Sequence, residues 1–482
     1  MAALLILSTE PAWPQATWTE LFPTGGPSGA ILGRQPVSPG YDPANNRLVV
    51  YFASNPAVSN PSPEVWVLTS ANGLGGPPAW IQLSPSGSPP IANANQTSVY
   101  DPVSNRLTVY GGCYANCSPA LSDVFVLTNA NGLGGTPAWV PIAVTNPQPR
   151  DGGSAVYDAS NNLMITFGGG LAFFGTDQND TRTLSNANGI ASPSSWSALS
   201  TSGGPPPVRE AHTATYDQAN NRMTIFGGSN LPVAIYNDAW VLANANGSGG
   251  LPAWQSLTTS GGPPAPRFVH SAVYDSTNNR MIVFGGLALS GSNYFALGDL
   301  WQLSYANGIG GTPTWTQLSP SGTGPGPNYS HVAVLDVANN RMIVFGGADQ
   351  NSQVHKRVWV LTMGLGPLYS TCLLYDPAKA AKSGSTMPIK LQLCDTNGNN
   401  QSSPSITVHA VSITQTSTSI SGPVQDSGNA NPDNDFRFDS TLGTTGGYIF
   451  NLSTKGLATG TYNLNFTVTG DTSVYSAPFQ VK

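Results

Sequence analysis

The chain has 482 residues, which is enough for two or three domains with a large buried core. Only 9% of its residues are charged, compared with about 25% in ordinary domains, its formal net charge is −6, and no lysine precedes Lys356. Because no basic stripe is present to neutralise phosphates, we expect no nucleic-acid ligand. Neutral polar residues must keep the surface soluble instead, which favours an extracellular or cell-surface protein or one that packs against copies of itself.

Residues 1–15 are predicted to form a separate segment that begins apolar. Its centre is Leu4, Leu5, Ile6 and Leu7, an uncharged, β-prone run far too short to cross a bilayer. Two interpretations stay open: the run is the remnant of a signal peptide without its basic region, or it is a strand that adds to a sheet edge of a neighbouring copy. No other segment approaches transmembrane length, so we expect no membrane span.

One sequence block recurs six times along the next 350 residues or so: Tyr-Asp-x-x-Asn-Asn-Arg-Met-x-x-Phe-Gly-Gly, with variations. The repeats are spaced 57 to 61 residues apart, as judged by their aspartates, Asp42, Asp101, Asp158, Asp217, Asp275 and Asp336. Regular self-similarity of this length is typical of repeat architectures. With four short strands per repeat, it predicts a β-propeller.

The fourth repeat illustrates the expected strands. Residues 212–216 form a short alternating run and residues 222–226 an apolar one, on either side of a turn that Asp217 and two asparagines favour. Gly227 and Gly228 follow, where a side chain would obstruct a close backbone approach. Residues 238–242 and 254–257 supply two further strands, so the unit is a four-stranded blade.

The blocks resemble the kelch repeat, with its paired glycines and later tryptophan, and the resemblance covers residues 12 to 362. It implies a galactose-oxidase-like central domain of a bacterial secreted protein. In the first repeat, Ala53 and Ser54 are taken to replace the glycine pair. The outer-strand tryptophans that match are Trp80, Trp139, Trp196, Trp254 and Trp315.

The repeat count also predicts how the ring closes. The sixth repeat ends near Leu361 without an outer strand, whereas residues 16–21 match residues 314–318 and precede the first blade. We therefore expect residues 16–362 to form a six-bladed propeller whose sixth blade is completed by residues 16–21. Closure of this kind removes the two free sheet edges of an open array.

After a linker at residues 363–367, the composition changes, and residues 368–482 are predicted to form an immunoglobulin-like β-sandwich. The expected strands are residues 389–393, 406–411, 448–452, 462–468 and 478–481. Pro388 and Lys390 resemble the signature of a small bacterial extracellular domain with a Pro-x-Lys-Phe core, with Leu391 in place of the phenylalanine. The fold class is thus all-β.

Four cysteines favour an oxidising compartment. Cys113 and Cys117 follow the glycine pair of the second repeat, and Cys372 and Cys394 lie in the C-terminal domain. We predict one disulfide in each domain, the second joining the first two strands of the sandwich. Half of a metal site is the alternative for Cys113 and Cys117, although no histidine is close in sequence.

Three of the five histidines occupy a repeat position, since His212, His270 and His331 each stand five residues before a repeat aspartate. Equivalent positions of a propeller lie around its channel, so the three either cluster on a metal or form separate structural hydrogen bonds. Galactose oxidase is a copper radical enzyme that needs a cysteine cross-linked to a tyrosine. A disulfide would consume both propeller cysteines, which argues against that chemistry.

Three residues before the histidine position, the repeats carry a ring of arginines and asparagines: Arg34, Asn93, Arg150, Arg209, Arg267 and Asn328. This ring either holds an anionic or glycan ligand or braces the next blade by bonding its backbone carbonyls. A second polar cluster, Asp426, Asp433 and Asp435, spaces oxygen ligands as calcium loops do, but it lacks the closing glutamate of an EF-hand. Otherwise we expect no cofactor and no catalytic residues.

These features predict a non-enzymatic, extracellular structural protein that assembles with copies of itself into a surface layer or filament. An adhesion or binding module that recognises glycan or protein through the propeller loops is the alternative. A carbohydrate-active enzyme or copper oxidase is a third, disfavoured one. The fold does not decide among them, because propellers serve all three classes.

Overall fold

The structure is a computed structural model of the chain. It describes residues 16–27, 39–53, 63–91, 94–113, 119–171, 177–291, 293–363, 369–395, 398–416, 420–424, 427, 430–443, 445–469, 471 and 474–482. Two compact units divide the chain, Thr17–Thr362 and a unit that contains Met363–Lys482. In the part that is described, no helix has the length and apolar character needed to span a membrane.

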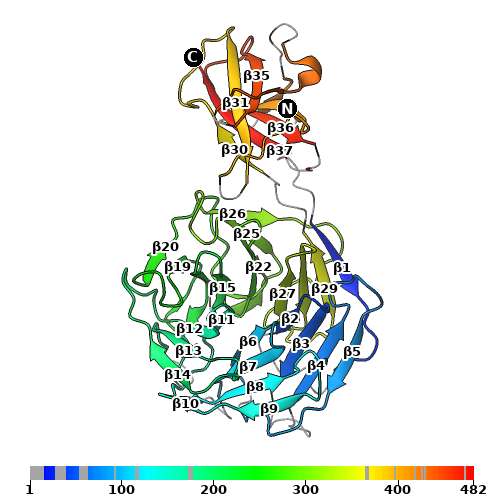
Figure 1. The fold of residues 1–482 in the computed structure, drawn as a ribbon, viewed down its shortest axis with the longest axis vertical. Helices are drawn as coiled ribbons and strands as arrows, with labels where there is room; N and C mark the ends of the chain where they lie inside the picture. The colour runs from blue at the N-terminus through cyan, green and yellow to red at the C-terminus, as the bar shows by residue number, and fades with distance from the viewer. Residues whose placement is uncertain are drawn as a thin grey trace. The chain divides into compact units, whose positions relative to one another are not determined.

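Within Thr17–Thr362, the described strands form six main sheets arranged as blades around a central axis (Figure 1). The innermost strand of each blade contacts that of the next blade, and the contact between the last and first blades closes the ring. The prediction of an all-β propeller built from four-stranded blades is therefore confirmed for this unit.

Neighbouring strands within the blades are antiparallel. The first blade contains β2 (Gly40–Asp42), β3 (Arg47–Phe52), β4 (Glu64–Thr69) and β5 (Ala79–Leu83). The second contains β6 (Thr97–Asp101), β7 (Arg106–Tyr110), β8 (Val124–Thr128) and β9 (Ala138–Pro141). The third contains β11 (Ser154–Asp158), β12 (Leu163–Phe167), β13 (Thr181–Ser185) and β14 (Ser194–Ala198), with β10 (Val144–Thr145) parallel to β14.

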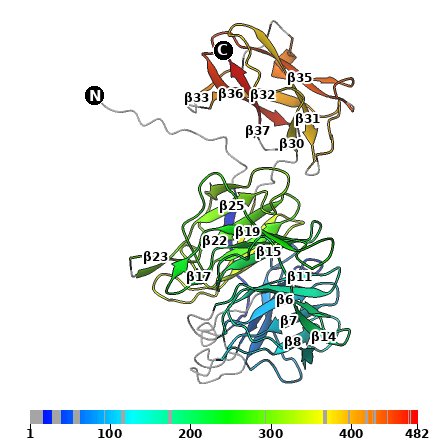
Figure 2. The same ribbon diagram turned by 90° about the vertical axis from the view of Figure 1, so that its left-hand side faces the viewer.

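Blades four and five each carry an additional hairpin between their second and third main strands. Blade four contains β15 (Thr213–Asp217), β16 (Arg222–Phe226), β19 (Ala239–Ala243) and β20 (Ala253–Ser256), with the hairpin β17 (Ser229–Asn230) and β18 (Ala234–Ile235). Blade five contains β21 (Ser271–Asp275), β22 (Arg280–Phe284), β25 (Leu300–Ser304) and β26 (Thr314–Leu318), with the hairpin β23 (Leu287–Ser290) and β24 (Asn293–Ala296). Figure 2 shows β17 and β23 at the same side of the propeller.

The sixth blade combines the two ends of the propeller segment. It contains β27 (Val332–Asp336), β28 (Arg341–Phe345) and β29 (Val358–Thr362), and its outermost strand is β1 (Thr17–Leu21). Strand β1 pairs antiparallel with β29, with Thr17 opposite Thr362 and Leu21 opposite Val358. The strand expected to close the ring therefore occupies that place.

An aromatic contact joins every blade to the next. In each blade, the aromatic side chain that ends the second strand packs against the outer-strand tryptophan of the following blade, with ring centroids 4.5 to 5.4 Å apart. At the junction between blades five and six, Phe284 contacts Trp18 of β1. In blade one, Tyr51 contacts Trp139, so Phe52 and Ala53 hold the glycine-pair positions, and the expected alignment on Ala53 and Ser54 was wrong by one residue.

The repeat aspartates stabilise both the turn that follows them and the contact with the next blade around the ring. Asp158 Oδ1 accepts hydrogen bonds from the backbone N–H groups of Ser160 and Asn161, as an Asx turn requires. Its Oδ2 accepts a bond from Asn246 Nδ2 at 2.6 Å. Equivalent asparagines bond to Asp336, Asp42, Asp101 and Asp217, in each case from the loop between the third and fourth strands of another blade.

Asp275 differs from the other repeat aspartates for a topological reason. The loop that would supply its asparagine does not exist, because the fourth strand of blade six comes from the opposite end of the segment. Arg280 takes the amide's place and donates to Asp275 Oδ2 at 2.8 Å and to Asn340 Oδ1 at 2.9 Å. The equivalent arginine of blade four, Arg222, donates instead to the carbonyl of Asn307.

The second unit is a two-sheet sandwich. One described sheet contains β30 (Ser370–Leu373), β31 (Thr386–Cys394), β34 (Arg437–Asp439) and β35 (Gly447–Ser453); the other contains β32 (Val408–Gln415), β33 (Ile420–Gly422), β36 (Gly460–Val468) and β37 (Val474–Val481). Apolar side chains of both sheets share one core, including Leu391, Phe450, Leu464 and Phe479. A short 3-10 helix, η1 (Pro432–Asn434), precedes β34. The second predicted strand starts two residues later and ends four residues later than expected.

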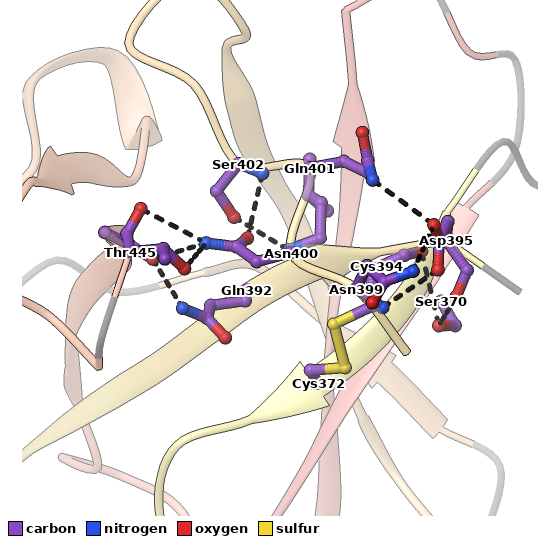
Figure 3. Close-up of a disulfide and its surroundings, with 12 residues drawn as sticks. Ser370, Cys372, Gln392, Cys394, Asp395, Asn399, Asn400, Gln401, Ser402 and Thr445 are labelled. Carbon is purple, nitrogen blue, oxygen red and sulfur yellow. Dashed lines mark hydrogen bonds between the residues drawn. A yellow bond between two sulfur atoms is a disulfide. The ribbon is translucent and has the colours of Figure 1, made fainter. Parts of the chain in front are cut away.

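The predicted disulfide between Cys372 and Cys394 is confirmed, and it ties β30 to the end of β31 (Figure 3). Side-chain amides hold the neighbouring loops beside it. Asn400 Nδ2 donates to Thr445 Oγ1 at 2.8 Å, and Gln392 Nε2 donates to the carbonyl of Gly446. The covalent link between the two strands therefore lies beside loops that are also fixed by hydrogen bonds.

Candidate functional site

A cavity of about 360 Å³ opens along the propeller axis. Its described walls come from the starts of the innermost strands and the residues just before them. His212, His270 and His331 line it, together with hydroxyl-bearing residues such as Thr97 and Ser154. The repeat therefore places equivalent short polar segments side by side, as expected for a propeller.

Each of the three histidines bonds to a hydroxyl of the preceding blade. His212 Nε2 lies 2.7 Å from Ser154 Oγ. His270 Nε2 lies 2.9 Å from Thr213 Oγ1, and His331 Nε2 lies 2.8 Å from Ser271 Oγ. The hydroxyl in each pair comes from the residue that follows the histidine position of its blade.

The geometry supports a structural role for the three histidines. Burial lowers the pKa of His212 and of His331 to about 3 and that of His270 well below its ordinary value of 6.5, so the rings are neutral near pH 7. Their rings also pack edge-on against the phenylalanine that ends the second strand of the preceding blade. Among the described residues, no group of three or more His, Cys, Asp or Glu side chains is arranged to hold a metal ion.

The glycine pairs make room for these histidines. At Gly227, whose φ is 65°, an added Cβ would lie 2.7 Å from the carbonyl oxygen of Arg267 and 2.8 Å from His270 Cε1. At Gly228, with φ of 91°, it would lie 2.6 Å from His212 Cβ. Side chains at either position would collide with the wall of the channel.

The described members of the arginine and asparagine ring are bonded within their own blades, which favours the bracing interpretation of that ring over the ligand interpretation, although the brace is within a blade and not to the next one. Arg209 and Arg267 are fully buried, and each makes a paired salt bridge with an aspartate of its own blade, Asp238 or Asp299, at 2.7 to 2.9 Å. Each also donates to the carbonyl of the first glycine of the pair. The guanidinium groups therefore brace their own blades.

The remaining members of the ring follow the same pattern as far as they are described. Arg150 Nη2 forms an ion pair with Asp180 at 2.5 Å, and Asn328 Nδ2 donates to the carbonyl of Gly346. Arg34 and Asn93 lie outside the described residues.

The mouth of the cavity is bordered by a chain of backbone hydrogen bonds that runs from blade to blade. Gly152 N–H donates to the carbonyl of Asn95, Ala211 to Gly152, Val269 to Ala211, and Ser330 to Val269, at 2.8 to 3.0 Å. All five residues have φ between 48° and 62°. This left-handed conformation is unfavourable for a β-branched residue such as Val269, so the ring of hydrogen bonds holds the mouth in a fixed shape.

In each of blades two to six, the residue that precedes the hydrogen-bonded residue at the mouth has an equivalent backbone but a different side chain. These residues are Ala94, Asp151, Glu210, Phe268 and Tyr329, and each forms a β-bridge with the segment that follows the second strand of its blade. A constant backbone thus presents two acidic and two aromatic side chains at successive positions. Variation of this kind on a conserved geometry is typical of a recognition surface.

Asp151, Asp177 and Glu210 form a cluster of carboxylates at this mouth. Glu210 lies over the backbone beside Asp151, because a Cβ on Gly152 would be 3.1 Å from Glu210 Oε2. Burial, followed by the charges of Asp177 and Asp151, raises the pKa of Glu210 to about 7. Burial and the charge of Asp151 raise the pKa of Asp177 to about 6, and burial raises that of Asp151 itself.

The cluster has no cation of its own in the described part of the chain, where none of the ion pairs involves these three carboxylates. Asp151 is only 2% exposed, and its Oδ1 has no hydrogen-bond partner, while Oδ2 receives a long bond of 3.4 Å from Asn95. The nearest guanidinium, Arg150, is committed to Asp180.

An apolar groove of about 300 Å³ separates the hairpins of blades four and five. Every described residue that lines it is apolar, and the most prominent are Leu231, Val233, Ile235, Leu289 and Phe295. Val233 is 76% exposed and Leu289 is 44% exposed. Burial of such side chains against a partner is favourable, at about 25 cal/mol per Å².

The groove and the carboxylate cluster are connected through one hairpin. The backbones of Glu210 and Ser229 exchange hydrogen bonds at 2.8 and 2.9 Å, and Ser229 of β17 pairs with Ile235 of β18. Two strand spacings therefore separate Glu210 from a residue of the groove, which is about 10 Å.

The remaining predicted site residues add little to the candidate site. Asp426, Cys117 and residues 4–7 lie outside the described residues, whereas Cys113 is disulfide-bonded. Asp435 Oδ1 lies 2.8 Å from His409 Nδ1, so that ligand of the predicted calcium loop already has a partner. Calcium binding there stays a prediction. The fifth histidine, His355, lies 3.5 Å from Asp349.

The sequence reasoning missed both surface features. The carboxylates were passed over because Asp151, Asp177 and Glu210 lie far apart in sequence or at different repeat offsets, and only the blade geometry brings them together. A signal was nevertheless present, since the position after the arginine or asparagine of that ring changes from Asp to Glu to Phe to Tyr in the last four repeats.

Comparisons with known proteins agree on the propeller. Residues 171–363 match the family model described as the KLHDC2/KLHL20/DRC7 Kelch-repeats domain, so this part of the chain is a kelch-repeat domain. The predicted resemblance is thereby confirmed for the propeller, whereas the relatives reported below are eukaryotic and give no support for a bacterial family.

Several curated proteins are similar over about half of the chain. Adagio-like protein 1 of Oryza sativa subsp. japonica is 27% identical over 285 residues, 56% of this chain and 41% of its own length. Host cell factor 1 of Homo sapiens is 30% identical over 256 residues, 48% of this chain and 12% of its own. Acyl-CoA-binding domain-containing protein 5 of Arabidopsis thaliana is 26% identical over 288 residues, 59% of this chain and 40% of its own. The chain spans less than half the length of these relatives.

Proposed function

We propose that this chain is a non-enzymatic, extracellular binding module whose propeller holds a polypeptide partner at the mouth of its channel. The apolar groove between the hairpins of blades four and five is the observation that carries the proposal. It is flanked by a mouth whose side chains vary on a fixed backbone, and Val233, Leu289 and Phe295 of its lining are exposed. A rigid propeller with variable loops suits recognition by a surface that needs no large rearrangement.

The chemistry of the groove favours protein over glycan as the partner. Sugars are recognised through hydrogen-bonding side chains, and the described lining of the groove offers apolar groups such as Leu231, Val233 and Phe295 instead. These groups match leucine, valine or aromatic side chains of an extended segment. The buried arginines, which are the candidates for a glycan or anion site, are already bonded within their blades.

The C-terminal unit fits an extracellular module as well. We propose that it is an immunoglobulin-like domain related to the Pro-x-Lys-Phe family, because two antiparallel sheets enclose one core and the Leu391 position of the motif is fully buried in it. The disulfide between Cys372 and Cys394 supports an oxidising compartment.

Peptide selection tests the binding function. A displayed library of random dodecapeptides is panned against the whole protein, and enriched peptides are measured against the variants Val233→Asp and Val103→Asp. Both valines are highly exposed, but Val103 follows Asp101 in the turn between β6 and β7, away from the groove. We expect enriched peptides to lose at least tenfold in affinity for V233D and to bind V103D like the native protein.

Peptides that bind V233D as tightly as the native protein would show that the groove is not the recognition surface. Failure to enrich any peptide that depends on this groove would overturn the proposal in the same way.

Self-assembly remains a second candidate function. It is favoured by the low content of charged residues, 9%, and by the uncharged run at residues 4–7. The apolar groove between the hairpins of blades four and five has the chemical character needed to bury such a run. A neighbouring copy would then be the polypeptide partner, and the chain would form a homopolymer.

A further inference from the structure

We infer that the carboxylate cluster at the channel mouth binds a cationic side chain, lysine or arginine, of the partner polypeptide. This inference rests on the proposed function and adds the chemical class of residue that the partner must present. Three carboxylates from two blades converge on one corner of the mouth, and one of them, Asp151, is buried with an oxygen that lacks a hydrogen bond.

The negative charge of the three carboxylates is not balanced by an ion pair among the described residues. The members of the cluster come from three places: Asp151 and Glu210 before the innermost strands of blades three and four, and Asp177 before the third strand of blade three. Asp151 is joined to Gly170 by two backbone hydrogen bonds, and the N–H of Gln178, the residue after Asp177, donates to Gly169. The two blade-three carboxylates are therefore held at one corner by the backbone.

The charged groups around the cluster do not neutralise it. Arg150 is bonded to Asp180, Arg209 to Asp238, and both bonds fix these guanidinium groups inside their blades. The neighbouring His212 is neutral near pH 7, because burial lowers its pKa to about 3. Burial raises the pKa of Asp151, and the charge of Arg150 acts in the opposite direction, but Arg150 makes no ion pair with the cluster. A cation that enters from outside would thus meet carboxylates that are not engaged in an ion pair among the described residues, and charge-assisted hydrogen bonds to such groups are strong.

Phe268 adds a second feature suited to a cation. It follows Glu210 at the equivalent position of the next blade, and the backbone residues after the two, Ala211 and Val269, are hydrogen-bonded to each other. Aromatic rings attract ammonium and guanidinium groups through their faces. Acidic and aromatic side chains are therefore neighbours at the mouth, as in many sites for positively charged groups.

The distance to the groove specifies the spacing in the partner. About 10 Å separates Glu210 from Ile235 across two strand spacings. An extended peptide spans about 7 Å in two residues and about 13 Å in four, and only such even spacings place both side chains on the same face. The partner segment should therefore carry its basic residue two or four positions from an apolar residue that fills the groove.

The test uses fluorescent octapeptides built on a sequence enriched by the library selection, with Lys, Arg, Gln or Glu either two or four positions from the groove-binding residue. At pH 8 we expect the Lys and Arg peptides to bind about tenfold more tightly than the Gln peptide, which corresponds to about 1.4 kcal/mol. The advantage should decline toward pH 5, because Glu210 and Asp177 then take up protons.

Charge-removing variants locate the effect. In Glu210→Gln and in Asp177→Asn the preference for Lys should fall to less than threefold, whereas Asp123→Asn, which removes an exposed carboxylate of blade two, should keep it. Thermal melts of all three variants exclude misfolding. Using two variants on different blades keeps the test informative if one of them is unstable.

The outcomes separate the two proposals. If the Gln peptide binds as tightly as the Lys peptide, and both lose affinity in V233D, the cationic inference is wrong and the binding function stands. If calcium chloride alone raises the melting temperature of the native protein but not of E210Q, the cluster is a divalent-cation site and the inference is also wrong. Enriched peptides that bind V233D as tightly as the native protein would contradict both proposals.

Discussion

Single residues of this propeller act mainly across blade boundaries. The histidine position pairs with a hydroxyl of the preceding blade, and the repeat aspartates accept amides from loops of other blades. Hydrogen bonds to a carboxylate contribute more than neutral ones. Sequence periodicity revealed that these residues recur, but the partner of each lies about 60 or 90 residues away, so the pairs could not be read from local spacing.

The inter-blade amide bonds predict a measurable stability difference. Asn246→Ala removes the hydrogen bond to Asp158 and should lower the free energy of unfolding by about 1.5 to 3 kcal/mol. Asn244→Gly is the matched control: it lies in the same loop and its amide bonds only to the carbonyl of Leu251. Glycine suits its φ of 53°. Equal losses in urea unfolding of the two variants would contradict the importance of the inter-blade bond.

The buried histidines predict acid sensitivity of defined sign. Burial lowers the pKa of His270 well below 6.5, so the unfolded chain binds more protons than the native protein in the acidic range. Their contribution to stability is complete above pH 6.5 and declines as the pH falls below it. In His270→Gln, which copies Gln96 of blade two, we expect a shallower decline between pH 6.5 and pH 4.5.

Urea midpoints measured at half-unit pH steps check this expectation. The alternative substitution Gln96→Ala should leave the slope of the decline unchanged, since Gln96 carries no titrating group. Parallel curves for the native protein and H270Q would mean that the histidine does not carry the proton linkage.

At the scale of strands and blades, the propeller was largely predictable and the surface was not. Hydrophobic alternation and the glycine pairs located the strands, because blade cores impose a period of two at fixed positions. The glycine-pair alignment failed in blade one, where Phe52 and Ala53 replace the pair, as the strand pairing and the contact of Tyr51 with Trp139 show. Strands β33 and β34 are short edges without clear alternation, so they were missed, whereas the strand that carries Cys372 was expected only from the disulfide.

Strand β1 should decide whether the ring is closed. Deletion of residues 1–22 removes β1 and Trp18, exposes the edge of β29, and should cause aggregation or a large fall in melting temperature. Deletion of residues 1–15 leaves β1 intact and serves as the control. Scanning calorimetry and light scattering of both proteins check the prediction; similar behaviour of the two truncations would refute closure by β1.

At the scale of the whole molecule, the open question is whether copies of the chain associate. Apolar residues at positions 4–7 should be buried against something, since leaving them in water costs about 25 cal/mol per Å². If they join copies, deletion of residues 2–7 should abolish assemblies seen by electron microscopy while the melting temperature stays the same. Assemblies that form unchanged, or a mature protein that begins after Leu7, would end the assembly hypothesis.

Closure by β1 also means that the propeller cannot close until the end of its segment has been synthesised. Leu21 pairs with Val358, so the first propeller strand is made long before its partner. At about 5–20 residues per second, roughly 20 to 70 seconds separate their departure from the ribosome. During that interval the growing chain carries an unpaired strand at each end of an incomplete array, and either strand can pair with another nascent chain. Chaperone protection, or export before folding, would therefore matter most in this period.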